Sequence, residues 1–173
     1  MTPHRRLILA LAVATALAAS GCTPEDPEPT PTPTGFASEQ EAFAAAEATY
    51  RAYNEAENTW IANGEGEDPA EYMIGDLRQS ELETRQTLED AGLSFVGEFE
   101  ILSFTGISAS TIAGSTSVEA VVCMDSTDVI LVDSDGNDVT PVDDEPLYAL
   151  KVGLTTVDGN FRIHESTTVD AQC

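Results

Sequence analysis

The sequence is poor in positive charge. Of its 173 residues, 7 are Lys or Arg and 31 are Asp or Glu, which gives a formal net charge of −24 at pH 7. Proteins that bind nucleic acids use Lys and Arg to contact phosphates and release counterions, so we expect no nucleic-acid partner. The same charge opposes binding to anionic lipid headgroups. Any attachment to a membrane must therefore come from a covalent anchor and not from a basic surface.

Residues typical of catalytic and metal sites are also scarce. The chain has two His and three Cys. It contains no Gly-rich phosphate loop, no Ser/His/Asp set and no Cys/His spacing of a zinc site. We therefore predict no cofactor, no metal site and no catalytic residue.

The one long apolar run lies near the start of the chain. Residues 7–17 (LILALAVATAL) follow a positive start that includes Arg5 and Arg6. This pattern is typical of an export signal, and the run is too short to span a bilayer. Small residues at 18–21 then lead into Cys22, which resembles the bacterial lipobox, although Ala19 stands where Leu is usual.

The lipobox resemblance implies that residues 1–21 are a lipoprotein signal peptide and that Cys22 is lipidated. The protein would then be anchored to the cell membrane on its extracytoplasmic face. The alternative is ordinary secretory cleavage, which would leave Cys22 as a free thiol. Residues 22–36 form the lipidated Cys and a tether, because TPEDPEPTPTPT at 23–34 alternates Pro with Thr or acid and favours an extended spacer.

Residues 37–173 have the length of one folded domain. Ser38 and Glu41 form a capping box, and apolar residues recur at helical spacing up to Gly64. Asp68-Pro69 repeats a helix-start signal. Ser80 with Glu83 caps a further helix that ends at Gly92. Three N-terminal helices are thus predicted.

Strand signals follow the helices. They place strands near 95–105, 116–125, 128–133, 146–157 and 160–168. In the second of these, alternation puts Val118, Ala120, Val122 and Met124 on one face. The order indicates an α+β domain with helices packed on an antiparallel sheet.

This order of elements resembles the NTF2-like (cystatin-like) fold, with three helices packed on a curved antiparallel sheet. Residues 121–125, 132–136 and 161–163, together with the terminal Cys173, are similar to uncharacterised actinobacterial lipoproteins of that fold. The resemblance implies a cone-shaped pocket between the long helix and the sheet, where enzymes of the fold place an Asp or His. Five aromatic residues are candidates to line it, although most of them could equally be core: Tyr50, Tyr53, Trp60, Tyr72 and Tyr148.

Two further groups of polar residues are candidates for a site. By alternation with Phe161 and Ile163, His164 lies on the face opposite the core, so we expect no catalytic role for it. Acidic and amide side chains near 133–145 offer oxygen ligands for Ca²⁺, but their spacing departs from an EF-hand and Asp135-Gly136 favours a hairpin turn. These residues are Asp133, Asp135, Asn137, Asp138, Asp143, Asp144 and Glu145.

The cysteine count predicts a disulfide. If lipidation consumes Cys22, then Cys123 and Cys173 remain in an exported, oxidising context where pairs normally oxidise. The expected function is a lipid-anchored extracytoplasmic module that binds a protein or a small apolar ligand. The alternative is an NTF2-like enzyme, of isomerase or hydrolase type, that uses the pocket between helix and sheet.

Overall fold

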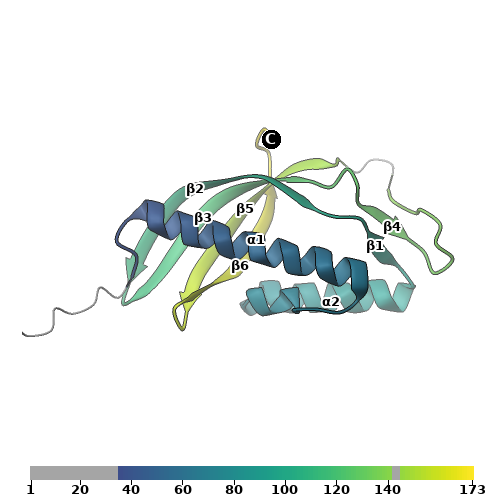
Figure 1. Cartoon of the computed structure of the whole chain (residues 1–173), viewed down its shortest axis with the longest axis horizontal. Helices are drawn as coiled ribbons and strands as arrows, with labels where there is room; N and C mark the ends of the chain where they lie inside the picture. The colour runs from purple at the N-terminus through teal and green to yellow at the C-terminus, as the bar shows by residue number, and fades with distance from the viewer. Residues whose placement is uncertain (1–34, 142–144) are drawn as a thin grey trace, which may run out of the picture. The chain divides into compact units, whose positions relative to one another are not determined.

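The computed structural model describes residues 35–141 and 145–173. In chain order the elements are α1 (Glu39–Asn63), the 3₁₀ helix η1 (Pro69–Tyr72), α2 (Gly75–Ala91), β1 (Ser94–Val96), β2 (Glu100–Ile112), β3 (Ser115–Asp125), β4 (Ile130–Val132), β5 (Leu147–Val157) and β6 (Asn160–Val169). Figure 1 shows α1 lying across one face of a curved sheet, with α2 beside it. The predicted α+β class with a curved antiparallel sheet is therefore confirmed.

The strands form two antiparallel sheets. The larger has the order β2-β3-β5-β6, and the smaller pairs β1 with β4. We expected one strand over 95–105, but the chain divides at Gly97. Gly97 has φ +112°, and a Cβ at this position would collide with the carbonyl of Asp128. This close approach, which requires glycine, separates β1 from β2 and creates the small sheet.

The core lies between α1 and the inner face of the larger sheet. Val118, Ala120 and Val122 are at most 1% exposed, as their alternation predicted. Gly106 in β2 lets α1 approach, because a Cβ there would come within 2.5 Å of the Phe43 ring. Phe161 and Ile163 of β6 and Tyr50 of α1 also belong to this cluster.

The prediction of three α-helices is wrong, because the described residues form two. α1 begins and ends as expected, with Ser38 as its N-cap and Gly64 after its last residue. Residues 69–72 form a single 3₁₀ turn and not an α-helix. The segment after this turn pairs with the sheet, since the Ile74 amide donates to the Ile163 carbonyl at 2.9 Å. That tertiary contact starts α2 at Gly75, earlier than the cap signal at Ser80 predicted.

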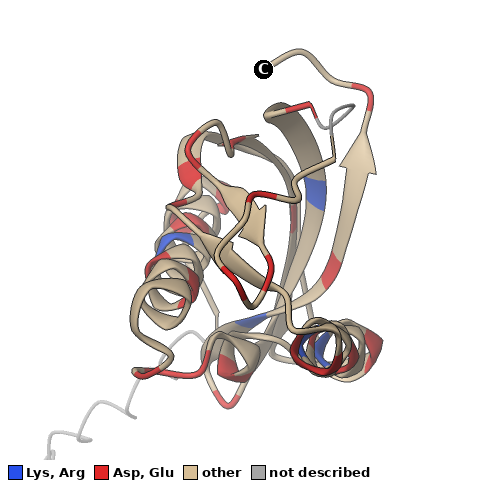
Figure 2. Ribbon diagram, turned by 90° about the vertical axis from the view of Figure 1, so that its right-hand side faces the viewer, with Lys and Arg blue, Asp and Glu red and all other residues tan. Residues whose placement is uncertain are grey.

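Acidic residues dominate the surface. Figure 2 shows many Asp and Glu segments along the helices and loops and few Lys or Arg segments. Neither described helix is long and apolar enough to cross a membrane.

Candidate functional site

An apolar cavity of about 600 Å³ lies between the small sheet and one end of the larger sheet. Phe95 of β1 and Leu131 of β4 line it from the small sheet, while Tyr148 of β5 and Thr168 of β6 line it from the larger one. Phe99, Val129 and Pro141 add further apolar surface. A concave, mainly apolar surface with a small number of polar groups is the usual form of a ligand site.

Hydrogen bonds hold the wall of this cavity in place. The amides of Asn54 and Asn58 in α1 both donate to the Phe99 carbonyl at 2.9 Å, and Asn58 Oδ1 accepts from the Phe99 amide at 2.9 Å. The Phe99 ring packs edge-on against Phe95 with a centroid distance of 6.2 Å. Phe95 is still 37% exposed. The cavity is thus preformed, and its rim presents apolar surface to solvent.

A second cavity, of about 660 Å³, lies beside the first and has a different chemistry. It runs between the C-terminal half of α1, the segment 98–101 and the loop after β3, and Phe99 lines both cavities. Its carboxylates are Glu55, Glu98, Glu100, Asp125 and Asp128. Arg51 also lines it, but its guanidinium is bound to Glu47, with Nη2 and Oε1 2.8 Å apart.

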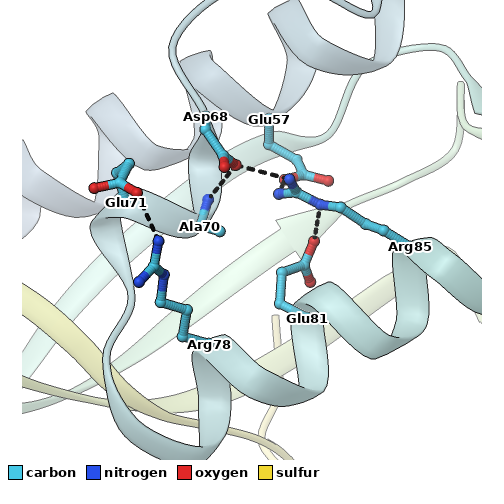
Figure 3. Close-up of polar contacts among 7 residues, drawn as sticks. All are labelled: Glu57, Asp68, Ala70, Glu71, Arg78, Glu81 and Arg85. Atoms are coloured by element: carbon cyan, nitrogen blue, oxygen red, sulfur yellow. Dashed lines mark hydrogen bonds and ion pairs between the residues drawn. The ribbon is translucent and has the colours of Figure 1, made fainter.

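A partly buried ion network joins α1, the start of η1 and α2 (Figure 3). Arg85 of α2 donates from Nη1 to Asp68 and from Nε to Glu81, both at 2.7 Å. Its guanidinium carbon also lies 5.5 Å from the centroid of the Trp60 ring. Glu57 is the third carboxylate, with Oε2 3.8 Å from Arg85 Nη2. That separation is too long for a hydrogen bond, and neither atom has another hydrogen-bond partner among the described residues.

The network carries more negative than positive charge. Burial, and then the nearby Glu81, raise the pKa of Glu57 from 4.5 to about 7, although Arg85 opposes the shift. Desolvation also acts on Asp68, but hydrogen bonds from Arg85 and the Ala70 amide outweigh it and lower the pKa of this carboxyl. Because α2 has no fully buried residue, these contacts are a large part of what holds it to α1. A structural role accounts for this network.

The five candidate aromatic residues do not share one cavity. Tyr148 lines the apolar cavity described above. Tyr50 is 3% exposed and belongs to the core. Tyr53 lies between Tyr50 and Tyr72, with ring centroids 5.5 and 6.4 Å away, and burial raises its pKa well above the usual value. Tyr72 also lines a small polar hollow beside α1, and Trp60 packs on Arg85.

The predicted disulfide is confirmed. Cys123 of β3 and Cys173 are bonded, with their Cα atoms 5.4 Å apart. Cys173 Sγ also lies 3.3 Å from the carbonyl of Tyr148. The bond ties the end of the chain to the outer face of the larger sheet, close to the apolar cavity.

His164 is exposed on the outer face, as predicted. It lies at a bulge in β6, where its ring packs against Gly153 of β5. Neither of the two large cavities is lined by it, as far as the described residues show.

The segment after β4 is a turn, as predicted. The Asp133 carboxylate accepts from the amides of Asp135 and Asn137 at 2.9 Å, and Gly136 has φ +80°. Among the described residues no group of His, Cys, Asp or Glu has the arrangement of a metal site. Asp143, Asp144, Cys22 and tether residues 23–34 lie outside the described residues, whereas Phe36, which we expected at the end of the tether, stacks on the core residue Phe161 with ring centroids 5.3 Å apart.

Much of the apolar cavity could not be found from the sequence. The sequence predicts ordinary strand positions for Phe95, Phe99 and Leu131. Their spacing gives no sign that Gly97 divides the first predicted strand. The signal available was Gly97 itself, since an isolated glycine within a strand pattern suggests a close backbone approach. In the Arg85 network, Glu81 and Arg85 are an i,i+4 pair that a helix places together, but Glu57 and Asp68 are far from Arg85 in sequence, and no local pattern indicates those two contacts.

Comparisons with known proteins support the fold alone. No family model matches the sequence, and no curated protein matches it. The chain is similar to the crystal structure of the intermembrane space region of chloroplast protein ARC6, with a TM-score of 0.51 and 16% sequence identity. The match covers 75% of this chain and 97% of that chain. It therefore supports an α+β domain and carries no evidence about ligand or activity.

Proposed function

We propose that this protein is a lipid-anchored extracytoplasmic binding module and that its ligand site is the apolar cavity between the two sheets. The observation that carries the proposal is the cavity of about 600 Å³, lined by Phe95, Phe99, Val129, Leu131 and Tyr148. Such surface is normally buried within a domain, and its exposure around a preformed cavity favours binding of an apolar group.

Two independent features support the extracytoplasmic location of the protein. The sequence has an export signal followed by Cys22 in a lipobox-like setting. The domain carries the Cys123–Cys173 disulfide, and such bonds persist in oxidising compartments. We further infer that the domain belongs to the NTF2-like class, because one long helix crosses a curved antiparallel sheet, as in the lipoproteins that its short motifs resemble.

An enzyme is the less supported alternative. Among the described residues one carboxylate, Glu145, lines the apolar cavity, and this residue is exposed. Glu57 has the raised pKa often found at catalytic sites, but Arg85, Asp68 and Glu81 surround it, and it lines neither large cavity. No convergent acid and base therefore favours proton-transfer chemistry in the cavity.

Binding of the neutral fluorescent dye Nile red tests the site, with an exported Cys22→Ser chain used to avoid lipid. Leu131→Asn removes an apolar wall, and Thr168→Trp fills the cavity from an exposed position. Each variant should weaken dye binding about ten-fold, as expected for the loss of roughly 1–2 kcal/mol of apolar contact. Ile112→Asn is the matched control, because Ile112 is 76% exposed and lies outside the cavity.

Equal dye binding by the wild type and both cavity variants would refute the proposed site. Circular dichroism of each variant would show that the fold is retained. The anchor is tested separately, because Cys22→Ser should move the protein from the detergent phase to the aqueous phase in cells that process lipoproteins. Unchanged partition would show that Cys22 is not the anchor.

A further inference from the structure

The second cavity, which we call the acidic cavity because five carboxylates line it, is a neighbour of the apolar cavity. Phe99 lines both, and the loop 125–129 contributes Asp125, Thr127 and Asp128 to the acidic cavity and Ser126 and Val129 to the apolar one. A ligand seated in the apolar cavity therefore lies next to the carboxylates of the other. This juxtaposition restricts the chemistry that such a ligand can have.

The carboxylates of the acidic cavity lack a cation of their own. Glu55, Glu98, Glu100 and Asp128 form no ion pair with a Lys or Arg within the described part of the chain. The nearest basic side chain, Arg51, is bound by Glu47. Exposed charges act over about 8 Å at physiological ionic strength, so this group attracts a cation held beside it.

The wall between the two cavities is fixed and not a loose loop. Asn54 and Asn58 clamp the backbone of Phe99 to α1. Gly97 packs directly on the Asp128 carbonyl, which couples the segment before β2 to the loop after β3. Asp125 accepts from the Thr127 amide at 2.8 Å and orders that loop. The backbone that carries these carboxylates is therefore ordered relative to the apolar cavity before any ligand arrives, which reduces the entropy lost on binding.

We propose that the occupant of the apolar cavity is a segment of a partner protein that carries Lys or Arg beside an aliphatic or aromatic anchor residue. This inference rests on the proposed function and names the partner class for the same site. The anchor fills the space lined by Phe95, Leu131 and Tyr148, while the basic side chains meet Glu98, Glu100 and Asp128. An acidic or neutral segment with the same anchor would be repelled or gain nothing from the acidic cavity.

The test is selection of random displayed peptides on the full-length chain, immobilised through an affinity tag. Glu98→Gln/Asp128→Asn removes two carboxylates of the acidic cavity, and neither side chain forms a hydrogen bond with another described residue. Glu89→Gln/Asp158→Asn is the matched control. Both control residues are exposed and outside the two cavities, and Asn suits the positive φ of Asp158. The two double variants have the same net charge, so general attraction of basic peptides falls equally in both.

Peptides with basic residues next to an apolar anchor should be enriched on the wild type. Their affinity should fall about five- to ten-fold on the Glu98→Gln/Asp128→Asn chain, as expected for two partly exposed ion pairs, and should stay within two-fold of wild type on the control. Raised salt should weaken the wild-type complex in the same way. Equal weakening on both double variants would show non-specific charge attraction and would overturn the inference.

The outcomes also separate the inference from the proposed function. Enrichment of neutral or acidic apolar peptides that Leu131→Asn abolishes would keep the apolar cavity as the binding site and would reject the basic partner. Enrichment that neither Leu131→Asn nor Thr168→Trp changes would reject both. Circular dichroism of each variant excludes loss of fold as the cause.

Discussion

Glu57 is expected to make the domain less stable as the pH rises. Its pKa is 4.5 in a free chain and about 7 in the folded domain, because burial and Glu81 disfavour the charged form more than Arg85 favours it. A difference of about 2.5 in pKa corresponds to about 3 kcal/mol of unfolding free energy before screening by solvent is considered. The side chain is 20% exposed, so we expect about 1–2 kcal/mol after solvent screening.

The direction of the effect follows from proton uptake. Below the unfolded pKa of 4.5, Glu57 is protonated in both the folded and the unfolded state. The domain then has the full stability that protonated Glu57 allows. That stability is lost as the pH rises through about 7, because the folded domain must then hold a poorly compensated charge. Carboxyls with a lowered pKa, such as Asp68, contribute stability above the unfolded pKa of 3.8 and lose it only as the pH falls below that value, so they do not obscure this window.

Glu57→Gln removes the titrating group and keeps its shape. Urea denaturation at about pH 5 and about pH 8 should show the wild type losing about 1–2 kcal/mol between them, while Glu57→Gln changes little. At the higher pH the variant should be the more stable protein. Glu89→Gln, an equal charge change at an exposed position of α2, should follow the wild type. A Glu57→Gln chain that is clearly less stable than the wild type at pH 8 would refute this account of the network.

Three further variants test the fold and the ligand site. Replacing Cys123 and Cys173 by Ser should lower the free energy of unfolding by about 4 kcal/mol, since the bond closes a loop between residues 50 apart; an unchanged denaturation midpoint would contradict this. Gly106→Ala should cost about 1–3 kcal/mol because its Cβ would press on the Phe43 ring, and a melting temperature equal to that of the wild type would show that α1 packs differently. His164→Ala should leave Nile red binding unchanged, and a clear loss would place the ligand on the outer face.

Local signals in the sequence predicted the elements whose ends depend on neighbouring residues. Ser38 and Gly64 bound α1 as expected, and alternation in β3 placed Val118, Ala120 and Val122 in the core. The same kind of signal failed at α2, where pairing of Ile74 with Ile163 decides the first residue of the helix.

The candidate site depended on contacts that no local pattern carries. Gly97 divides a strand because it packs on Asp128, and this contact creates the small sheet that lines the cavity. Tyr148 was identified as a candidate from its aromatic character, whereas Phe95 and Leu131 lie in segments that read only as strands. The disulfide could be predicted because it followed from counting cysteines and from the compartment, and not from geometry.

The most direct test of the binding site is photo-crosslinking in living cells that make and export the full-length protein. A photoreactive phenylalanine in place of Phe95 keeps the ring that lines the apolar cavity, and the same residue at Val96 stands next to it on β1 but outside the cavity. Phe95 is 37% exposed and Val96 48% exposed, so the two positions are matched for accessibility. We predict a discrete adduct from position 95 that is absent from position 96 and is lost when Leu131→Asn is added. The same adducts from both positions, or an adduct at 95 that Leu131→Asn leaves unchanged, would contradict the assignment of the apolar cavity as the ligand site.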